Sequence, residues 1–135
     1  MKPCFADTFF FLAWWNRRDL AHDRVQEFLA GYSGRLLTTR WVLMEVADGF
    51  ASSRMRCEVR RLFAEMESDG QITIVEPVES LYRRGLELYA ARPDKEWSLS
   101  DCISFVVMAD EGLTEALTGD GHFTQAGFKA LLLAE

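Results

Sequence analysis

The sequence predicts an α/β fold in which a mainly parallel central sheet of about five strands is flanked by helices. Short apolar runs alternate along the chain with segments whose apolar residues recur at helical spacing. This alternation is typical of parallel strands joined by helical crossovers. The length of 135 residues and the apolar content of 49% match one domain with its own core. No linker or internal repeat divides the sequence, so residues 1–135 are expected to form a single domain.

Changes of pattern define the elements of the first half of the chain. An apolar run ends at Asp7, and Asp19 is a good N-cap for the helical stripe that follows. Thr39 is a similar cap after the second apolar run. The predicted elements are a strand over 3–6, a helix from Asp19 to Gly31, a strand over 35–38, a helix over 40–50 and a helix over 55–66.

The second half continues the same alternation. Pro77 breaks the third strand pattern, and Gly112 ends a helix. Residues 102–109 are almost entirely apolar, so this segment is expected to be a helix buried on all sides. The predicted elements are a strand over 71–75, a helix over 77–91, a helix over 102–109, a strand over 115–118 and a fifth strand over 130–133.

The charge balance argues against a simple nucleic-acid-binding module. The chain carries 15 basic and 21 acidic residues, a net charge of −6, which is the wrong sign for such a module. The basic residues are 12 Arg and 3 Lys, and arginine forms bidentate pairs with phosphate. The sequence therefore still allows a partner that carries phosphate, provided that the positions of the acidic residues explain the net negative charge.

The cysteines and the N-terminus indicate a cytoplasmic protein. Cys4, Cys57 and Cys102 are widely spaced and form no C-x-x-C motif, so neither a zinc site nor a disulfide framework is indicated. The apolar run near the start is interrupted by Asp7 and lacks a small-residue cleavage site, unlike a signal peptide. No run reaches the roughly 18 apolar residues of a membrane span, so no membrane association is expected.

Four carboxylates are predicted to meet at one edge of the sheet. Asp7 ends the first strand, Asp120 ends the fourth, Asp101 opens the buried helix and Glu45 lies in the helix after the second strand. Parallel strands end at a common edge, where α/β proteins bind ligands. Converging carboxylates repel one another and favour a cation such as Mg²⁺, which takes oxygen ligands.

Each carboxylate also has an ordinary structural explanation, and both readings stay open. Asp7 ends a strand, and Ser98 with Asp101 fits a capping box. Asp120 and Gly121 form a common turn pair, and Glu45 fits a solvated helix face.

The acidic positions stand in short motifs that resemble a known family. These are Ala6-Asp7-Thr8, Thr38-Thr39 followed by Val42-Leu43-Met44-Glu45-Val46, Ser98-Leu99-Ser100-Asp101-Cys102, and Leu117-Thr118-Gly119-Asp120-Gly121-His122-Phe123. Their order and spacing resemble the PIN domain, most closely the VapC-like ribonucleases of bacterial and archaeal toxin–antitoxin pairs. The resemblance extends from about Pro3 to Phe128, and the acids are 38, 56 and 19 residues apart.

This resemblance implies a Mg²⁺- or Mn²⁺-dependent endoribonuclease. Asp7, Glu45, Asp101 and Asp120 match the acidic quartet that holds the metal in that family. In such an enzyme the metal would lower the pKa of water and stabilise charge on the leaving 3′-oxygen. In-line attack of that water on phosphorus, with cleavage of the bond to the 3′-oxygen, would leave a 5′-phosphate and a 3′-hydroxyl. No protein general base is assigned.

Several neighbours of the acids have two readings. The hydroxyls of Thr8, Ser100 and Thr118 either orient water and carboxylates or bond to the backbone at strand ends. The His122 imidazole is expected to bond to the local backbone rather than act as a ligand or base, and His22 is expected at the surface.

The resemblance also implies an RNA substrate, a homodimer and a cognate antitoxin. The aromatics between residues 9 and 15 exceed what one face of a short helix can bury, so some are expected to contact a partner, with core packing as the default for at least half of them. Arg54, Arg56, Arg60 and Arg61 form either a phosphate-facing patch or a solvated face paired with Glu58 and Glu65, and the second is preferred.

Other functions stay open at the level of sequence. A structure-specific DNA nuclease on the same fold is one alternative, although such relatives carry long insertions. A non-catalytic interaction module is another. A phosphoacceptor receiver domain is disfavoured because Asp7 has no acidic neighbour and Lys129 lies in the wrong context.

Overall fold

Five parallel strands form one sheet in the order β3-β2-β1-β4-β5. The computed structural model describes residues 2–133. The strands are β1 (Cys4–Ala6), β2 (Leu36–Thr39), β3 (Ile72–Val75), β4 (Glu115–Leu117) and β5 (Lys129–Ala130). The predicted α/β class is confirmed, and the sheet is parallel throughout these residues rather than mainly parallel.

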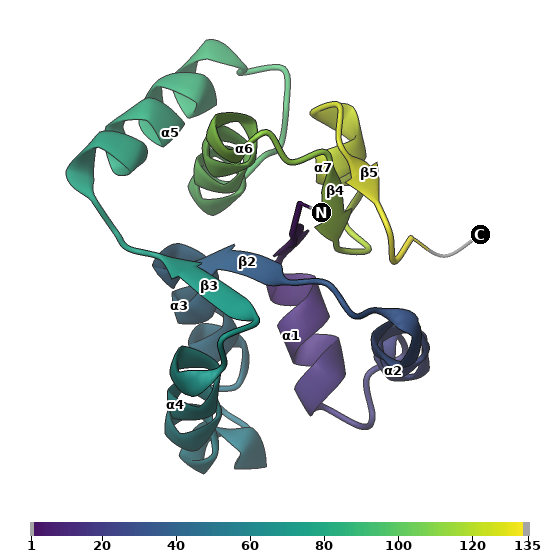
Figure 1. The fold of residues 1–135 in the computed structure, drawn as a ribbon. Coiled ribbons are helices and arrows are strands. Elements are labelled where there is room, and N and C mark those ends of the chain that lie inside the picture. Colours follow the sequence, from purple (N-terminus) through teal and green to yellow (C-terminus); the bar gives the residue numbers. More distant parts are fainter. Residues whose placement is uncertain (1, 134–135) are drawn as a thin grey trace.

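Helices cover both faces of this sheet. They are α1 (Thr8–Trp15), α2 (His22–Gly31), α3 (Arg40–Gly49), α4 (Val59–Ser68), α5 (Glu79–Ala91), α6 (Leu99–Glu111) and α7 (Gly121–Gln125). Figure 1 shows α1 to α4 on one side of the sheet and α5 with α6 on the other. Within residues 2–133, no helix combines the length and hydropathy that crossing a membrane requires.

Two of the three predicted helix N-caps form, those at Thr39 and Ser98, whereas Asp19 does not cap α2. The Thr39 side chain accepts a hydrogen bond from the Val42 N–H at the start of α3. Ser98 and Asp101 exchange side-chain-to-backbone hydrogen bonds as a capping box at the start of α6. Gly112 ends α6 with a φ of 66°, a left-handed conformation that glycine adopts without steric cost. Thr39 thus fixes the start of α3, the helix after β2, and Ser98 and Gly112 fix the two ends of α6, the helix before β4.

Several element boundaries differ from the sequence prediction: α6, for example, covers Leu99–Glu111 rather than 102–109, and α7 has no predicted counterpart. The segment that starts at Met55 is first a 3₁₀ turn (η1, Arg54–Cys57), because the Ser53 side chain accepts from the Met55 N–H, and α4 begins at Val59. Asp19 accepts from the Ala21 N–H in a turn, so α2 begins later, at His22. The fifth strand covers Lys129–Ala130 instead of 130–133.

The core lies between the central strands and the helices on either side. β1 is fully buried, and so is most of α6, as its apolar sequence predicts, although Ala109 at its end is exposed. Cys4 and Cys102 are buried in this core, Cys57 is exposed, and all three are free. Because β1 and β4 pair with each other inside this core, their carboxyl ends are held in fixed positions.

Gly85 allows α5 to pack closely on α6. A Cβ at this position would lie 3.2 Å from both the N and the Cα of Ile103 and would overlap the Ile103 side chain. Backbone atoms of a buried helix cannot move aside easily, so the small residue is a packing requirement.

We predict that Gly85→Ala lowers the free energy of unfolding by about 1–3 kcal/mol, because the added methyl group overpacks the α5–α6 contact. Urea unfolding measures the change. The matched control is Gly31→Ala, where nothing lies within 4 Å of the added Cβ. This variant should be neutral or up to about 1 kcal/mol more stable. If both variants gained stability equally, the close approach of the two helices would be refuted.

Candidate functional site

Five carboxylates line one cavity at the carboxyl edge of the sheet, and four of them are the acids that the sequence singles out. Asp7 follows β1, Asp120 follows β4, Glu45 lies in α3 and Asp101 lies in the first turn of α6. The cavity has a volume of about 490 Å³ and is also lined by Thr8, Phe9, Glu96, Ser98 and His122. The structure thus brings together all four acids that the sequence singles out.

Two hydroxyl groups hold the Glu45 carboxylate. Thr8 Oγ1 donates to Glu45 Oε1 at 2.8 Å, and Ser100 Oγ donates to the same oxygen at 2.9 Å. Since Thr8 begins α1 and Ser100 lies in α6, one carboxylate of α3 is fixed by the two helices beside it. Both hydroxyls therefore contact an acid and do not serve only as backbone partners.

A third hydroxyl joins the ends of β1 and β4. Thr118 Oγ1 donates to Asp7 Oδ2 at 2.9 Å and accepts from the Asp120 N–H at 3.0 Å. Asp120 Oδ1 in turn accepts from the His122 N–H at 2.9 Å and caps α7. Asp120 thus belongs to a helix cap rather than to an isolated turn.

The His122 imidazole contacts the acids and not the local backbone, contrary to the sequence interpretation. Its Nδ1 lies 3.0 Å from Asp101 Oδ2 and 3.5 Å from Asp120 Oδ1. The hydrogen bond with Asp101 raises the pKa of His122, and the charges of Asp120 and Glu96 act in the same direction. Asp101, Asp120 and His122 offer ligand atoms that lie within 4.8 Å of one another.

His22, expected at the surface, is half-buried. Its Nδ1 lies 2.7 Å from the Ala13 carbonyl oxygen, which ties α2 to α1. It takes no part in the acidic cavity.

Burial dominates the electrostatics of Asp7. The pKa of this carboxyl is raised to about 7, mainly by desolvation and to a smaller extent by the charges of Asp101 and Glu45, while the Thr8 backbone N–H and the Thr118 hydroxyl act in the opposite direction. A buried carboxylate among other acids is costly to ionise unless a cation lies nearby. A raised pKa at Asp7 is therefore consistent with a cation site, although burial of a structural carboxyl has the same effect.

Sequence reasoning missed Glu96 and Phe9 in the wall of the cavity. Glu96 stands two residues before Ser98, the N-cap of α6, and its loop turns it toward the other acids. The position of Glu96, two residues before the N-cap of the helix that carries Asp101, is the sequence signal that could have identified it. The sequence pattern does not distinguish Phe9 from the other aromatics between residues 9 and 15.

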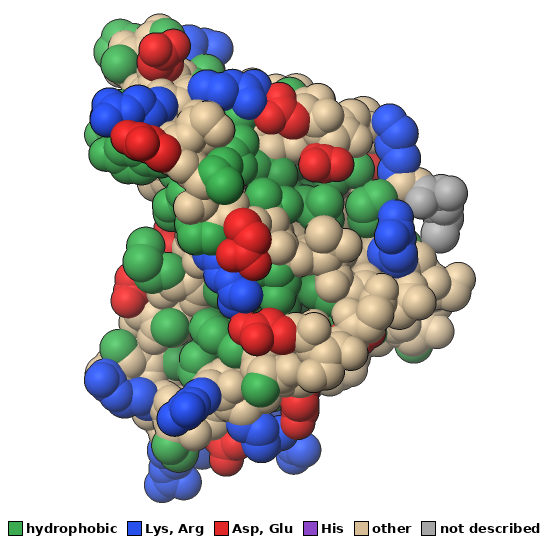
Figure 2. All heavy atoms as spheres, turned by 60° about the vertical axis from the view of Figure 1, so that its left-hand side comes forward, with side chains coloured by type: hydrophobic (Ala, Val, Ile, Leu, Met, Phe, Trp, Pro, Cys, Tyr) green, Lys and Arg blue, Asp and Glu red, His purple; other side chains and the backbone are tan. Residues whose placement is uncertain are grey.

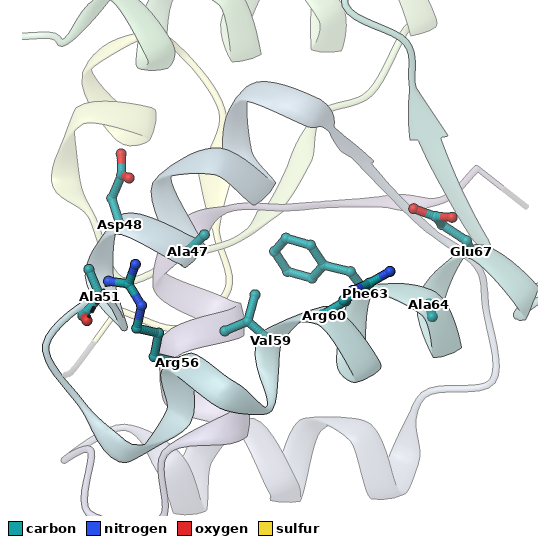
Figure 3. A pocket seen from close by; sticks show the side chains of 9 residues that line it. All are labelled: Ala47, Asp48, Ala51, Arg56, Val59, Arg60, Phe63, Ala64 and Glu67. Carbon is teal, nitrogen blue, oxygen red and sulfur yellow. Dashed lines mark hydrogen bonds between the residues drawn. The ribbon is translucent and has the colours of Figure 1, made fainter.

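The arginines between residues 54 and 61 do not form one continuous patch. Arg61 pairs with Glu58 and Glu65, as the preferred reading predicts. Arg56 and Arg60 border a hollow between α3 and α4, into which Val59 and Phe63 project (Figure 3). The remaining arginine, Arg54, borders a different hollow with Arg17 and Arg18.

The aromatic run of α1 belongs mainly to the core. Phe10 and Phe11 are completely buried, and Trp14 and Trp15 are half-buried and stack on each other with ring centroids 5.6 Å apart. Trp15 also contacts the Phe63 ring of α4. Packing within the chain, the default expectation for at least half of these aromatics, therefore accounts for most of residues 9–15.

Comparison with known proteins agrees with the motifs. The family model described as PIN domain matches residues 4–129. The "23S rRNA-specific endonuclease VapC20" of Mycobacterium tuberculosis is 27% identical over 126 residues, which are 92% of this chain and 94% of that protein. Its crystal structure, described as a "Sarcin-Ricin loop cleaving toxin", superposes with a TM-score of 0.82 at 26% identity and covers 93% of this chain and 95% of that one.

Two further solved structures share the fold. One is a toxin–antitoxin complex from Klebsiella pneumoniae, with a TM-score of 0.61, 16% identity and 87% coverage of each chain. The other is FitAcB from Neisseria gonorrhoeae, with a TM-score of 0.62, 20% identity and 94% coverage of each chain. At these identities the likeness concerns the fold.

We predict that the metal-free protein loses stability as the pH rises from 5 to 8. An unfolded aspartate ionises near 3.8, whereas folded Asp7 keeps its proton up to about 7. Between these values the folded state binds more protons, so the free energy of unfolding falls as the pH rises.

Asp7→Asn cannot ionise and should escape this part of the loss. Its melting temperature should fall by about 5 °C less than that of the wild type between pH 5 and pH 8. Calorimetry in the presence of EDTA measures the difference. Equal pH dependence in the two proteins would contradict the electrostatic role of Asp7.

Proposed function

The chain belongs to the PIN domain family, and from this premise we propose that it is a metal-dependent endoribonuclease that acts as the toxin of a toxin–antitoxin pair. The observation that carries the proposal is the convergence of Asp7, Glu45, Asp101 and Asp120 on one cavity. A capping box or a turn pair explains one acid at a time, but neither explains why acids of four elements meet.

The donor set fits a hard divalent cation such as Mg²⁺ or Mn²⁺. Its members are carboxylates, the ligands that such ions prefer. Both hydroxyls that bind Glu45 use Oε1, and within residues 2–133 no hydrogen bond engages Oε2. Asp101 likewise accepts from its partners only at Oδ2 within that range. These two acids therefore keep an oxygen free for a cation, and Asp7 and Asp120 complete the set.

A bound cation lowers the pKa of water and offsets negative charge on phosphate oxygens. The chain's own groups keep the acids in place for this chemistry: Thr8 and Ser100 hold Glu45, and Thr118 holds Asp7. Hydrolysis of the phosphodiester would leave a 5′-phosphate and a 3′-hydroxyl. A net charge of −6 would then be compatible with a polyanionic substrate, because a cation held by the four acids would offset part of their negative charge.

RNA is the proposed substrate. The relative that aligns with 92% of this chain is named for cleavage of 23S rRNA, so ribosomal RNA is the first substrate to test. A DNA nuclease and a non-catalytic interaction module are the alternatives, and the assay below separates them from a ribonuclease.

We predict that Asp101→Asn abolishes metal-dependent RNA cleavage while the protein stays folded. The change removes a ligand charge and relieves repulsion among the remaining acids, so the stability of the metal-free protein should hold or rise. Cleavage is measured on ribosomal RNA and on DNA, with Mg²⁺, Mn²⁺ or EDTA. Loss of more than 100-fold is expected, as for removal of a group that acts directly in the reaction.

The matched control is Asp110→Asn, the same substitution in the same helix. Asp110 is exposed and pairs with Arg84 outside the cavity, so this variant should cleave at the wild-type rate. Mg²⁺ or Mn²⁺ should raise the melting temperature of the wild type and of Asp110→Asn by mass action, and of Asp101→Asn by less. Wild-type cleavage by Asp101→Asn would refute the assignment.

We also propose that a cognate antitoxin restrains the enzyme. A solved structure that shares this fold is described as a toxin–antitoxin complex. Expression of the wild-type chain should slow growth, Asp101→Asn should not, and co-expression of a small partner encoded beside the gene should restore growth. Equal toxicity of the wild type and Asp101→Asn would exclude a nuclease toxin.

A homodimer is proposed through α5 rather than through the aromatic run of α1. Val78 at its N-cap, Tyr82, Leu86 and Tyr89 form an exposed apolar stripe along one side of this helix, 38–50% accessible. Figure 2, with this side of the molecule turned forward, shows exposed hydrophobic side chains around an indentation. A twofold interface uses the same patch of both copies, so a single stripe suffices.

We predict that light scattering at micromolar concentration gives twice the 15.5 kDa mass of one chain. Leu86→Lys should shift the mass to that of one chain, because it places a charge in the middle of the stripe. Leu20→Lys is the control, since Leu20 is fully exposed and lies outside α5. A wild-type mass of one chain would refute the dimer.

A further inference from the structure

The acidic cavity has one apolar side chain in its wall. Phe9 is half-buried and lines the cavity beside Asp7. The other residues of the wall, all within the described chain, are polar or charged: Asp7, Thr8, Glu45, Glu96, Ser98, Asp101, Asp120 and His122. A ligand in this cavity therefore meets carboxylates and, beside them, a hydrocarbon ring.

The Phe9 ring is braced by Gly119. A Cβ at residue 119 would lie less than 3.0 Å from three ring atoms, Cε1, Cε2 and Cζ. The missing side chain lets the outer half of the ring rest on the backbone next to Asp120. Phe9 itself lies in the first turn of α1, two residues after Asp7. The ring is thus fixed by the same two segments that carry two of the acids.

Phe9 stands apart from the aromatic packing of the rest of α1. Its neighbours Phe10, Phe11, Trp14 and Trp15 contact one another ring against ring. Among residues 2–133, Phe9 forms no such pair with another ring. Phe9 also packs against the edge of the core, but among residues 2–133 its ring has no aromatic partner.

We propose that Phe9 is a stacking surface for one nucleobase of the RNA, next to the phosphate that is cleaved. This inference rests on the ribonuclease activity proposed above. Single-stranded RNA presents unstacked bases that pack on aromatic side chains. A nucleotide joins a planar base to a phosphate, so it matches a cavity in which an aromatic ring adjoins a cation-binding acidic cluster.

Stacking on Phe9 would position the RNA in the cavity without selecting a particular base. Every base has a π face, so an aromatic ring tolerates any of them. A base seated on a braced ring places its own phosphate in a fixed relation to Asp7 and Asp120, and the energy of stacking appears as tighter binding of the RNA.

The first test replaces the ring but keeps its apolar character. Phe9→Leu should raise the KM for a single-stranded oligoribonucleotide about tenfold, the usual loss for one base–aromatic contact. Its metal-induced rise in melting temperature should match that of the wild type. Phe63→Leu is the matched control, because Phe63 is also a half-buried phenylalanine but lines the hollow between α3 and α4. This control should keep the wild-type KM.

The second test removes bases from the RNA, one position at a time. For the wild type, an abasic nucleotide at one position beside the cleaved bond should raise the KM about tenfold, whereas Phe9→Leu should be insensitive at that position. Binding of the same oligonucleotides, measured by fluorescence anisotropy with Asp101→Asn as the non-cleaving background, should show the same pattern.

The outcomes separate the two proposals. If the wild type cleaves RNA and Phe9→Leu cleaves it equally well, or keeps the abasic sensitivity, the stacking role is refuted and the nuclease stands. If the wild type neither cleaves nor binds RNA, the proposed function fails and the stacking role fails with it.

Discussion

Repulsion among carboxylates at one edge of the sheet is the constraint around which this part of the molecule is built. Hydroxyl groups and backbone N–H groups from neighbouring elements hold the acids: Thr8 and Ser100 bind Glu45, and Thr118 binds Asp7. The effect is to link α1, α3 and α6 through a single carboxylate. The hydrogen bonds of the chain itself therefore hold these acids in place.

The parts that follow from local pattern or from topology were predictable. Thr39 and the pair Ser98–Asp101 cap helices because capping depends on residues three apart in the chain. Asp7 and Asp120 were expected to be neighbours because parallel strands end at a common edge. Their convergence with Glu45 and Asp101 was expected because parallel strands joined by right-handed crossovers bring the segments after their carboxyl ends together.

The parts that depend on side-chain contacts between distant segments were not predictable. His122 was expected to bond to the backbone, but α6 brings Asp101 within 3.0 Å of its Nδ1. The α1 aromatics exceed one helix face, yet α2, α3 and α4 surround this helix closely enough to cover most of them, as the contact of Trp15 with Phe63 illustrates. Helical periodicity states how many residues share a face, not how many neighbouring elements that helix will have.

The pairing of β1 with β4 has a consequence for the order in which the molecule is made. β1 lies between β2 and β4, and the hydrogen bond from Thr118 to Asp7 spans 111 residues of sequence. Contacts between such distant segments form late in folding, because a long loop must close first. During synthesis β1 can pair with β2 long before β4 exists. A chain still emerging from the ribosome thus carries its first acids without the last, and the cluster is complete only once translation has passed Asp120.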